Sequence, residues 1–269
     1  MRTFFSQNNR ELLFLLAGIT LISCSSQKTS HDVSGISNLK EISLLTADSI
    51  TVYGDILFQD SAYPTILLFH QGGSNARAEY APVIKQLLDE LPKINILAID
   101  QRSGGQTYGS YNRTVFRLSP YKNHSMCDTY SDLEAALNYI TKRNVTGPVI
   151  VWGSSYSGSL AIQLAAKNGD SISAVLAFSP ASGGPMANCK PDDFFEGMST
   201  PLLVLRPEQE LQIESVQKQF ELLEQHGHQT YVAQNGVHGS SMLVSRRTGS
   251  PVDLNWNTIL NFINKIAAN

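Results

Sequence analysis

Three serines lie close together in the stretch VWGSSYSGSL, residues 151–160. A serine hydroxyl acts as a nucleophile when a histidine takes its proton and a carboxylate orients that histidine. The stretch approximates the pattern Gly-x-Ser-x-Gly, which places a nucleophilic serine on a sharp turn between a strand and a helix. Its last position departs from the pattern, because Ser157 stands where the second glycine is expected. The chemical question is whether Ser154, Ser155 or Ser157 is the nucleophile.

The steric demands of such a turn favour Ser155. Residues two positions before and after the nucleophile crowd together, so both must be small. The flanking residues of Ser155 are Gly153 and Ser157, whereas those of Ser154 are two large aromatic residues. Ser157 also has small flanking residues, but it lies two residues too far from the end of the strand. We therefore predict Ser155 as the nucleophile; the alternative is a structural turn in which the serines cap a helix.

The base and the acid of a triad are expected after later strands. His238 lies in a glycine-containing loop, NGVHGS, and we predict it as the base. The segment PEQEL follows a buried strand and offers two carboxylates. Glu210 is the first choice, because a carboxylate a few residues past the strand can turn back toward the histidine; Glu208 is the second. His226 and His228 have a spacing that suits a metal, but no third ligand is near, so we predict no metal and no cofactor.

Backbone N–H groups are needed to stabilise an oxyanion, and the segment HQGGS supplies candidates. It follows an apolar run at 65–70, where one donor is expected. We predict Gly72 as this donor, with Gln71 as the alternative, and Tyr156, the residue after the nucleophile, as the second donor. His70 is expected to be structural, because the predicted triad already has a base.

These residues depend on an alternation of strands and helices. Apolar runs predict eight strands, at 41–46, 50–58, 65–70, 94–100, 148–153, 173–179, 200–206 and 228–234. Helical periodicity predicts helices at about 78–91, 129–143, 159–169, 213–227 and from 251 onward. Thr129 and Asp132 fit a capping pair for the second of these. The alternation predicts an α/β fold, in which a mostly parallel eight-stranded sheet carries helices on both faces and function at the carboxyl edge.

The order Ser155, Glu210, His238, with HQGGSN, AIDQRSGG and GSSYSG at strand ends, resembles the α/β-hydrolase superfamily, and within it the dienelactone-hydrolase-like and esterase groups. The resemblance covers about residues 40–269. It implies a serine hydrolase that cleaves a small-molecule ester, or a related acyl bond, through an acyl-enzyme. Segment 180–199 stands where many relatives carry a cap domain and is too short for one, so we expect no large cap domain. The alternatives are a small envelope peptidase and a non-catalytic binding protein on the same fold.

The start of the chain predicts export. Residues 1–23 have a basic start, an apolar run and small residues at its end, which is typical of a signal peptide. The sequence Leu-Ile-Ser-Cys ending at Cys24 resembles the bacterial lipobox, in which the cysteine is lipidated. Residues 24–39 are then the lipidated cysteine and a flexible tether, and 40–269 the hydrolase domain. We expect a protein of the bacterial cell envelope that is held to the membrane by its lipid; the alternative is a plain signal peptide.

Composition limits the partners. The chain has 269 residues, a formal charge of −3 and no run of like charges, so it gives no electrostatic reason to expect a nucleic acid partner. Cys127 and Cys189 lie in two loops, 106–127 and 180–199, that we expect to border the site. In an exported protein they can form a disulfide, and two free thiols are the alternative.

Overall fold

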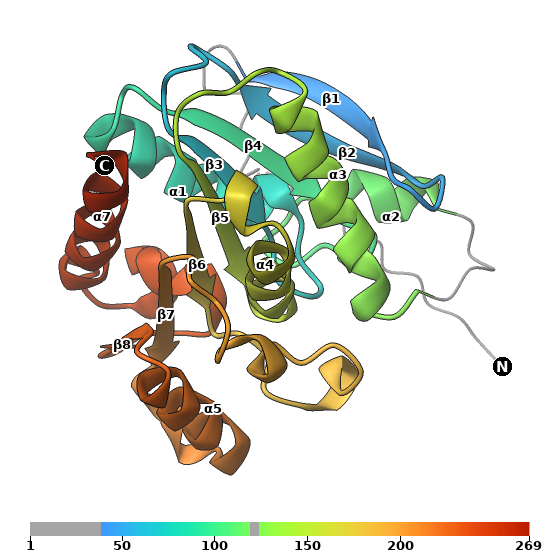
Figure 1. Cartoon of the computed structure of the whole chain (residues 1–269). Helices are drawn as coiled ribbons and strands as arrows, with labels where there is room; N and C mark the ends of the chain where they lie inside the picture. Colours follow the sequence, from blue (N-terminus) through green and yellow to red (C-terminus); the bar gives the residue numbers. More distant parts are fainter. Residues whose placement is uncertain (1–38, 119–123, 269) are drawn as a thin grey trace, which may run out of the picture.

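A single eight-stranded sheet forms the centre of the protein, as shown in Figure 1. The computed structural model describes residues 39–118 and 124–268. The strand order is β1-β2-β4-β3-β5-β6-β7-β8. The strands are β1 (Lys40–Leu45), β2 (Thr51–Leu57), β3 (Thr65–Phe69), β4 (Asn95–Asp100), β5 (Val149–Ser154), β6 (Ala174–Phe178), β7 (Leu202–Pro207) and β8 (Gln229–Ala233). Only β2 runs antiparallel to its two neighbours, so the predicted mostly parallel sheet is confirmed.

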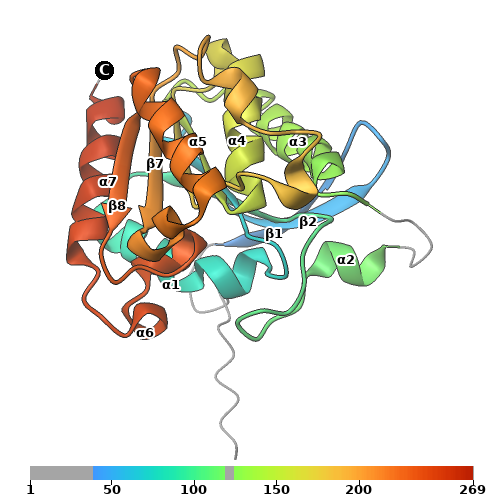
Figure 2. The same ribbon diagram turned by 90° about the horizontal axis from the view of Figure 1, so that it is seen from below.

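Helices cover both faces of this sheet. They are α1 (Ala76–Glu90), α2 (Arg113–Arg117), α3 (Tyr130–Thr141), α4 (Tyr156–Lys167), α5 (Glu214–Gln225), α6 (Ser245–Thr248) and α7 (Asp253–Ala267). Helices α1 and α7 pack on one face, and α3 and α4 pack on the other, which Figures 1 and 2 show from two directions. Segment 180–199 contains only two short 3-10 turns, in agreement with the expected absence of a large cap domain there.

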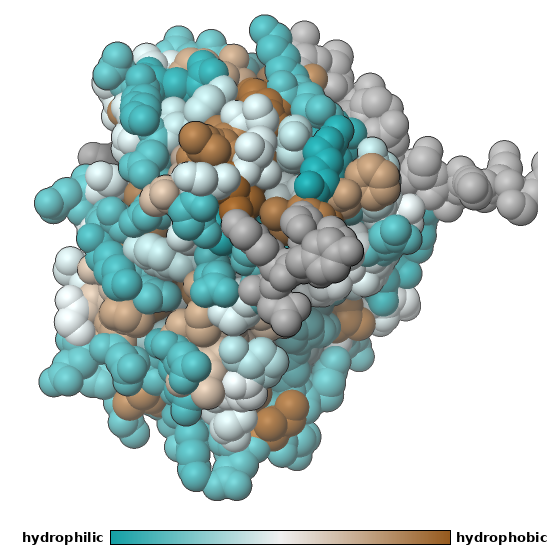
Figure 3. Space-filling view, turned by 90° about the vertical axis from the view of Figure 1, so that its right-hand side faces the viewer, coloured by the Kyte–Doolittle hydropathy of each residue, from teal (hydrophilic) through white to brown (hydrophobic). Residues whose placement is uncertain are grey.

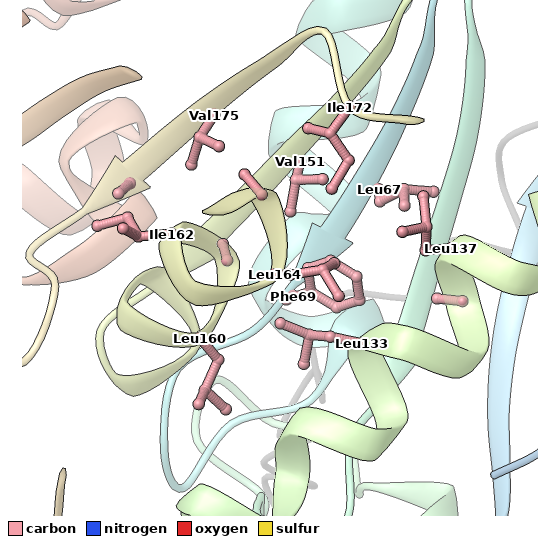
Figure 4. Close-up of a cluster of buried hydrophobic side chains, with 14 of the residues drawn as sticks. Leu67, Phe69, Leu133, Leu137, Val151, Leu160, Ile162, Leu164, Ile172 and Val175 are labelled. Carbon is pink, nitrogen blue, oxygen red and sulfur yellow. The ribbon is translucent and has the colours of Figure 1, made fainter. Parts of the chain in front are cut away.

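The core is divided in two by the sheet. In β3, Leu67 and Phe69 point toward α3 and α4, where Leu133 contributes to the same cluster (Figure 4). Ile66 and Leu68 alternate with them and belong to the cluster under α1 and α7. Because successive strand residues point to opposite faces, a strand buried on both faces must be apolar throughout. This explains why the central strands are continuous apolar runs in the sequence.

Two local predictions were wrong. Helix α4 begins at Tyr156, three residues before the predicted start at 159, because the helix continues directly from the turn at Ser155. Thr129 precedes α3 without a side-chain capping bond. Asp132 is instead fully buried, and its carboxylate accepts hydrogen bonds from the Arg102 backbone N–H (2.7 Å) and Nε (2.8 Å). A buried ion pair between α3 and the segment after β4 thus takes the place of a local cap.

The surface is mainly polar on the side that Figure 3 shows, where small hydrophobic areas lie among hydrophilic residues. No helix within 39–118 and 124–268 is long and apolar enough to cross a membrane. The predicted signal segment, Cys24 and nearly all of the predicted tether lie outside the described residues.

Leu133 on α3 tests the packing of one half of the core. It is fully buried against the sheet, so Leu133→Ala should lower the free energy of unfolding by about 2–5 kcal/mol. Urea unfolding followed by circular dichroism measures this change. Asn138→Ala, at an exposed position of the same helix, is the control and should change stability by about 0.5 kcal/mol or less. Equal effects of the two substitutions would contradict the packing.

Candidate active site

Ser155 occupies a strained turn between β5 and α4. Its φ and ψ angles are 61° and −125°, a region that residues other than glycine rarely adopt. Its backbone N–H donates to the carbonyl of Phe178 at the end of β6 (2.7 Å). A Cβ atom at Gly153 would lie 2.2 Å from the carbonyl oxygen of Ser157, so only glycine fits at that position. The crowding expected on both sides of Ser155 is therefore present.

Ser157 is small enough for the turn, and its hydroxyl also forms hydrogen bonds to neighbouring backbone groups. The backbone N–H of Ser154 donates to its Oγ (3.0 Å). The same Oγ lies 2.6 Å from the carbonyl oxygen of Phe69 and 2.9 Å from that of His70, and it can donate its one hydrogen to either. A glycine here could make none of these bonds. The hydroxyl thus connects the turn at Ser155 to the end of β3, where the oxyanion segment begins.

The structure brings His238 and Glu210 together. His238 Nδ1 lies 2.6 Å from Glu210 Oε1, while the His238 side chain remains 52% exposed. Glu210 lies in a short 3-10 segment, Glu208–Gln212, directly after β7. The side chain of Glu208, the second choice of acid, is exposed. A carboxylate at Nδ1 fixes the imidazole so that Nε2 is the nitrogen able to take a proton.

The loop that carries His238 is bound to the turn that carries Ser155. The N–H of Gly239 donates to Ser179 Oγ (3.1 Å), and the N–H of Ser240 donates to Ser154 Oγ (2.9 Å). Gly239 has a φ of 67°, and a Cβ atom there would lie 2.4 Å from Ser154 Oγ. These contacts bring the loop that carries His238 against Ser154, the residue before the candidate nucleophile. Among the described residues, Ser155 Oγ makes no hydrogen bond, and none joins it to His238. Hydrogen bonds between catalytic groups are often long or poorly aligned before substrate binds.

Arg206 was not identified from the sequence as a site residue. It is the buried arginine near the end of β7, and its Nη1 donates to Glu210 Oε2 (2.9 Å). Burial raises the pKa of Glu210, but the hydrogen bond and charge of His238 and the charge of Arg206 outweigh it, so the pKa lies below its ordinary value. Both carboxylate oxygens therefore have partners, and Glu210 is held as an anion in one orientation.

The candidate oxyanion donors are the backbone N–H groups of Tyr156 and Gly72, with Gln71 as the alternative. Tyr156 is the first residue of α4, so its N–H has no partner within the helix. A Cβ atom built on Gly72 would lie 3.7 Å from the ring of Tyr156, which shows that the two segments meet. The N–H of Gln71, the alternative donor, is already bound to the buried carboxylate of Glu79 (2.9 Å). This favours Gly72 over Gln71.

His70 fixes the orientation of the peptide unit between Gln71 and Gly72, and so of the Gly72 N–H. Its Nδ1 lies 2.8 Å from the carbonyl oxygen of Gln71, and the N–H of Gln101 donates to its Nε2 (3.0 Å). Burial lowers the pKa of His70, which is consistent with a neutral ring that donates at Nδ1 and accepts at Nε2. Since a trans peptide points its N–H away from the preceding carbonyl, fixing the Gln71 oxygen also fixes the Gly72 N–H.

A disulfide connects the two loops that border this region. Cys127 and Cys189 are bonded with an S–S distance of 2.03 Å and lie 62 residues apart in the sequence. Neighbouring Met126 reaches toward the oxyanion segment, since its Cε would lie 3.4 Å from a Cβ on Gly72. Residues 119–123 of the first loop lie outside the described part of the chain.

No group of three or more metal-ligating side chains occurs among the described residues. The predicted His226 and His228 pair lies at the end of α5 and before β8, and His228 Nε2 contacts the carbonyl oxygen of Phe195 (2.8 Å). A surface hollow of about 590 Å³ lies at the opposite edge of the sheet, next to Pro148 and Pro201, and none of the predicted triad residues lines it.

Comparisons with solved structures identify the fold of the chain. An esterase of Pyrococcus furiosus superimposes with a TM-score of 0.61 and 18% identity, over 84% of this chain and 90% of the esterase. The α/β hydrolase GrgF of a Penicillium species gives a TM-score of 0.64 and 14% identity, over 86% and 99%. The chain therefore has the α/β-hydrolase fold, as predicted.

Two further relatives are matched over only part of their length. An acylaminoacyl peptidase of Pyrococcus horikoshii gives a TM-score of 0.60 and 14% identity over 85% of this chain, but only 41% of the peptidase is covered. Protein bem46 of Schizosaccharomyces pombe is 27% identical over 142 residues, which are 51% of this chain and 42% of bem46. The chain thus spans less than half of either protein. No protein-family model matches the sequence.

The lowered pKa of Glu210 predicts a pH-dependent contribution to stability. A carboxylate whose folded pKa is lowered stabilises the protein above its unfolded pKa, about 4.3 for glutamate, and loses this contribution as the pH falls through the folded value. Glu210→Gln should therefore be less stable than the wild type near neutral pH, and the difference should shrink below about pH 4. Urea unfolding of both proteins across this range measures it. A difference that is constant with pH would contradict the assignment.

Proposed function

We propose that the protein is a serine hydrolase that cleaves a carboxylic ester, or a related acyl bond, with Ser155 as nucleophile, His238 as base and Glu210 as the orienting acid. The observation that supports this most strongly is the hydrogen bond between His238 and Glu210, carried on a loop that is bound to the strained turn at Ser155. Strain at such a turn and a paired histidine and carboxylate are together typical of nucleophilic catalysis.

The proposed reaction has two halves. Ser155 Oγ attacks the substrate carbonyl carbon while His238 Nε2 takes its proton, and the N–H groups of Gly72 and Tyr156 donate to the oxyanion. Collapse breaks the acyl bond, and the leaving group takes the proton from His238. Water then attacks the acyl-enzyme, gives a proton to His238, and the acid is released as Ser155 recovers its proton. Glu210 stays ionised throughout and stabilises the imidazolium.

We also propose that the protein is exported and anchored to the bacterial cell envelope through lipidated Cys24. The support is the lipobox-like sequence that ends at Cys24 and the polar segment that follows it. As a random coil, residues 25–38 would span on the order of 20 Å. That length would hold the hydrolase domain close to the membrane without requiring a docking surface.

A fluorophosphonate probe tests the proposed nucleophile. Wild-type protein should be labelled at Ser155, and Ser155→Ala should lose both labelling and turnover of p-nitrophenyl esters, with a loss in kcat on the order of 10⁴ to 10⁶. Ser157→Ala is the comparison: it removes a neighbouring hydroxyl that supports the turn but leaves Ser155 Oγ in place, so labelling at Ser155 should persist at a lower rate. Folded wild-type protein that is not labelled would favour a non-catalytic binding protein.

The same preparation distinguishes an esterase from a peptidase. We expect hydrolysis of short p-nitrophenyl esters at a kcat/KM well above that of acylated peptides or amino acid anilides. The fold of the Pyrococcus horikoshii peptidase makes the comparison necessary. Faster cleavage of the peptides would assign the protein to the peptidases and leave the triad unchanged.

Metabolic labelling with a palmitate analogue tests the anchor. The wild-type chain expressed in a bacterium should be labelled and found in the membrane fraction. Cys24→Ala should lose the label, whereas Ser25→Ala, at the next position, should keep it. Unlabelled wild-type protein would favour the plain signal peptide.

A further inference from the structure

The buried acid Glu79 has no role in the proposed triad. It lies in the first turn of α1 and is fully buried. Its Oε2 accepts the hydrogen bond from the Gln71 N–H (2.9 Å), and its Oε1 makes no hydrogen bond within the described part of the chain. A fully buried carboxyl group without an ion-pair partner of its own is costly, so its presence beside the oxyanion segment requires an explanation.

Three parts of the candidate site meet near this carboxyl group. The oxyanion segment reaches it through the Gln71 N–H. The turn at Ser155 comes close to the same segment, because a Cβ atom built on Gly239 would lie 2.4 Å from Ser154 Oγ and 2.6 Å from Gln71 Oε1. The histidine loop is one bond further away, because the N–H of Ser240 donates to that same hydroxyl oxygen (2.9 Å). Glu79 is therefore located behind the reaction centre, where the three parts must be kept in register.

Arg247 fixes the backbone of Glu79 from the opposite side. Pro82 lies inside α1 and has no N–H to donate to the carbonyl of Ala78, four residues earlier. Arg247 on α6 supplies the missing donor through Nη2 to the Ala78 oxygen (2.6 Å), and its Nη1 also donates to the Glu79 oxygen (3.0 Å). The start of α1 is thereby attached to the segment that follows His238.

Burial favours the neutral form of Glu79, which suits a group close to an oxyanion site. Burial raises the pKa of Glu79, and the Gln71 N–H, the Ser154 hydroxyl and the charge of Arg247 offset this only in part. A neutral carboxylic acid still accepts a hydrogen bond through its carbonyl oxygen, and it does not repel the negative charge that forms in the transition state.

We propose that Glu79 is a positioning residue that holds the Gln71 N–H and thereby aims the Gly72 N–H at the oxyanion. This inference rests on the proposed serine hydrolase function. With the Gln71 N–H bound to Glu79 and the Gln71 carbonyl bound to His70, the peptide units on both sides of Gln71 are fixed in rotation. Gly72 then needs no reorganisation when charge develops, which is the condition under which such a donor contributes most.

Substitutions of Glu79 separate positioning from burial. Glu79→Gln keeps an acceptor oxygen at the same distance and should retain kcat within about threefold, whereas Glu79→Met removes the acceptor and should lower kcat about 10²-fold with KM nearly unchanged. Glu79→Asp keeps an acid but withdraws it from the Gln71 N–H, and should lower kcat by about tenfold or more. The rate of p-nitrophenyl acetate hydrolysis is divided by the concentration of reactive sites, which is measured by titration to completion with a fluorophosphonate. The quotient is kcat per titrated site.

Asn95→Leu is the matched control for loss of a buried polar group. Asn95 is fully buried at the start of β4, at the opposite edge of the sheet, where its Oδ1 accepts from the Gln59 N–H (2.8 Å). This variant should be less stable, yet keep kcat per titrated site. Circular dichroism confirms that each variant is folded, and Glu79→Asp replaces Glu79→Met if the latter does not fold.

Two results would overturn the inference. The first is wild-type kcat per titrated site in both Glu79→Met and Glu79→Asp. The second is a loss in Glu79→Gln as large as that in Glu79→Met, because a held acceptor would then not be the relevant property. Failure of the proposed function is distinguished by a separate result, a folded wild-type protein that neither hydrolyses esters nor reacts with the probe. That result would also rule out the proposed role of Glu79.

Discussion

The crowded turn at Ser155 is the constraint on which the rest of the site depends. Backbone atoms of Ser157 occupy the space that any side chain at position 153 would need, and Ser155 itself has a positive φ. Such a conformation persists only when the surrounding structure fixes it. Here β5 on one side and α4 on the other do so, together with the bond from the Ser155 N–H to β6. The turn leaves the hydroxyl of Ser155 without a hydrogen bond among the described residues, whereas the hydroxyls of Ser154 and Ser157 on either side both have partners.

Serine side chains, rather than glycines, connect this turn to its surroundings. Ser157 reaches the end of β3, Ser154 accepts from the histidine loop, and Ser179 accepts from Gly239. Each of these serines is almost fully buried, and each satisfies a backbone group that would otherwise be buried without a partner. The serine-rich sequence around Ser155 is thus explained by the hydrogen bonds that align strand ends, as well as by chemistry.

Much of the fold could be predicted from the sequence, because strands buried on both faces must be continuous apolar runs, and their order determines which loops meet at the carboxyl edge. Ser155, Glu210 and His238 were selected in this way, and the structure brings the side chains of Glu210 and His238 together. Arg206 and Glu79 were not, since an arginine in a strand and a glutamate in a helix look ordinary until segments distant in the sequence are brought together. Asp132 was misread for the same reason: its partner, Arg102, lies 30 residues away.

Two acids near the candidate site have different environments. Glu210 is kept as an anion by Arg206 and faces the base, where a positive charge develops. Glu79 is fully buried and accepts from the N–H of Gln71, next to the proposed oxyanion donor Gly72. The most direct measurement of the central claim is peptide mapping by mass spectrometry after rapid acid quench during turnover of p-nitrophenyl acetate. An acetyl group is expected on Ser155. An acetyl group on another residue, or turnover with no acylated peptide, would contradict Ser155 as the nucleophile.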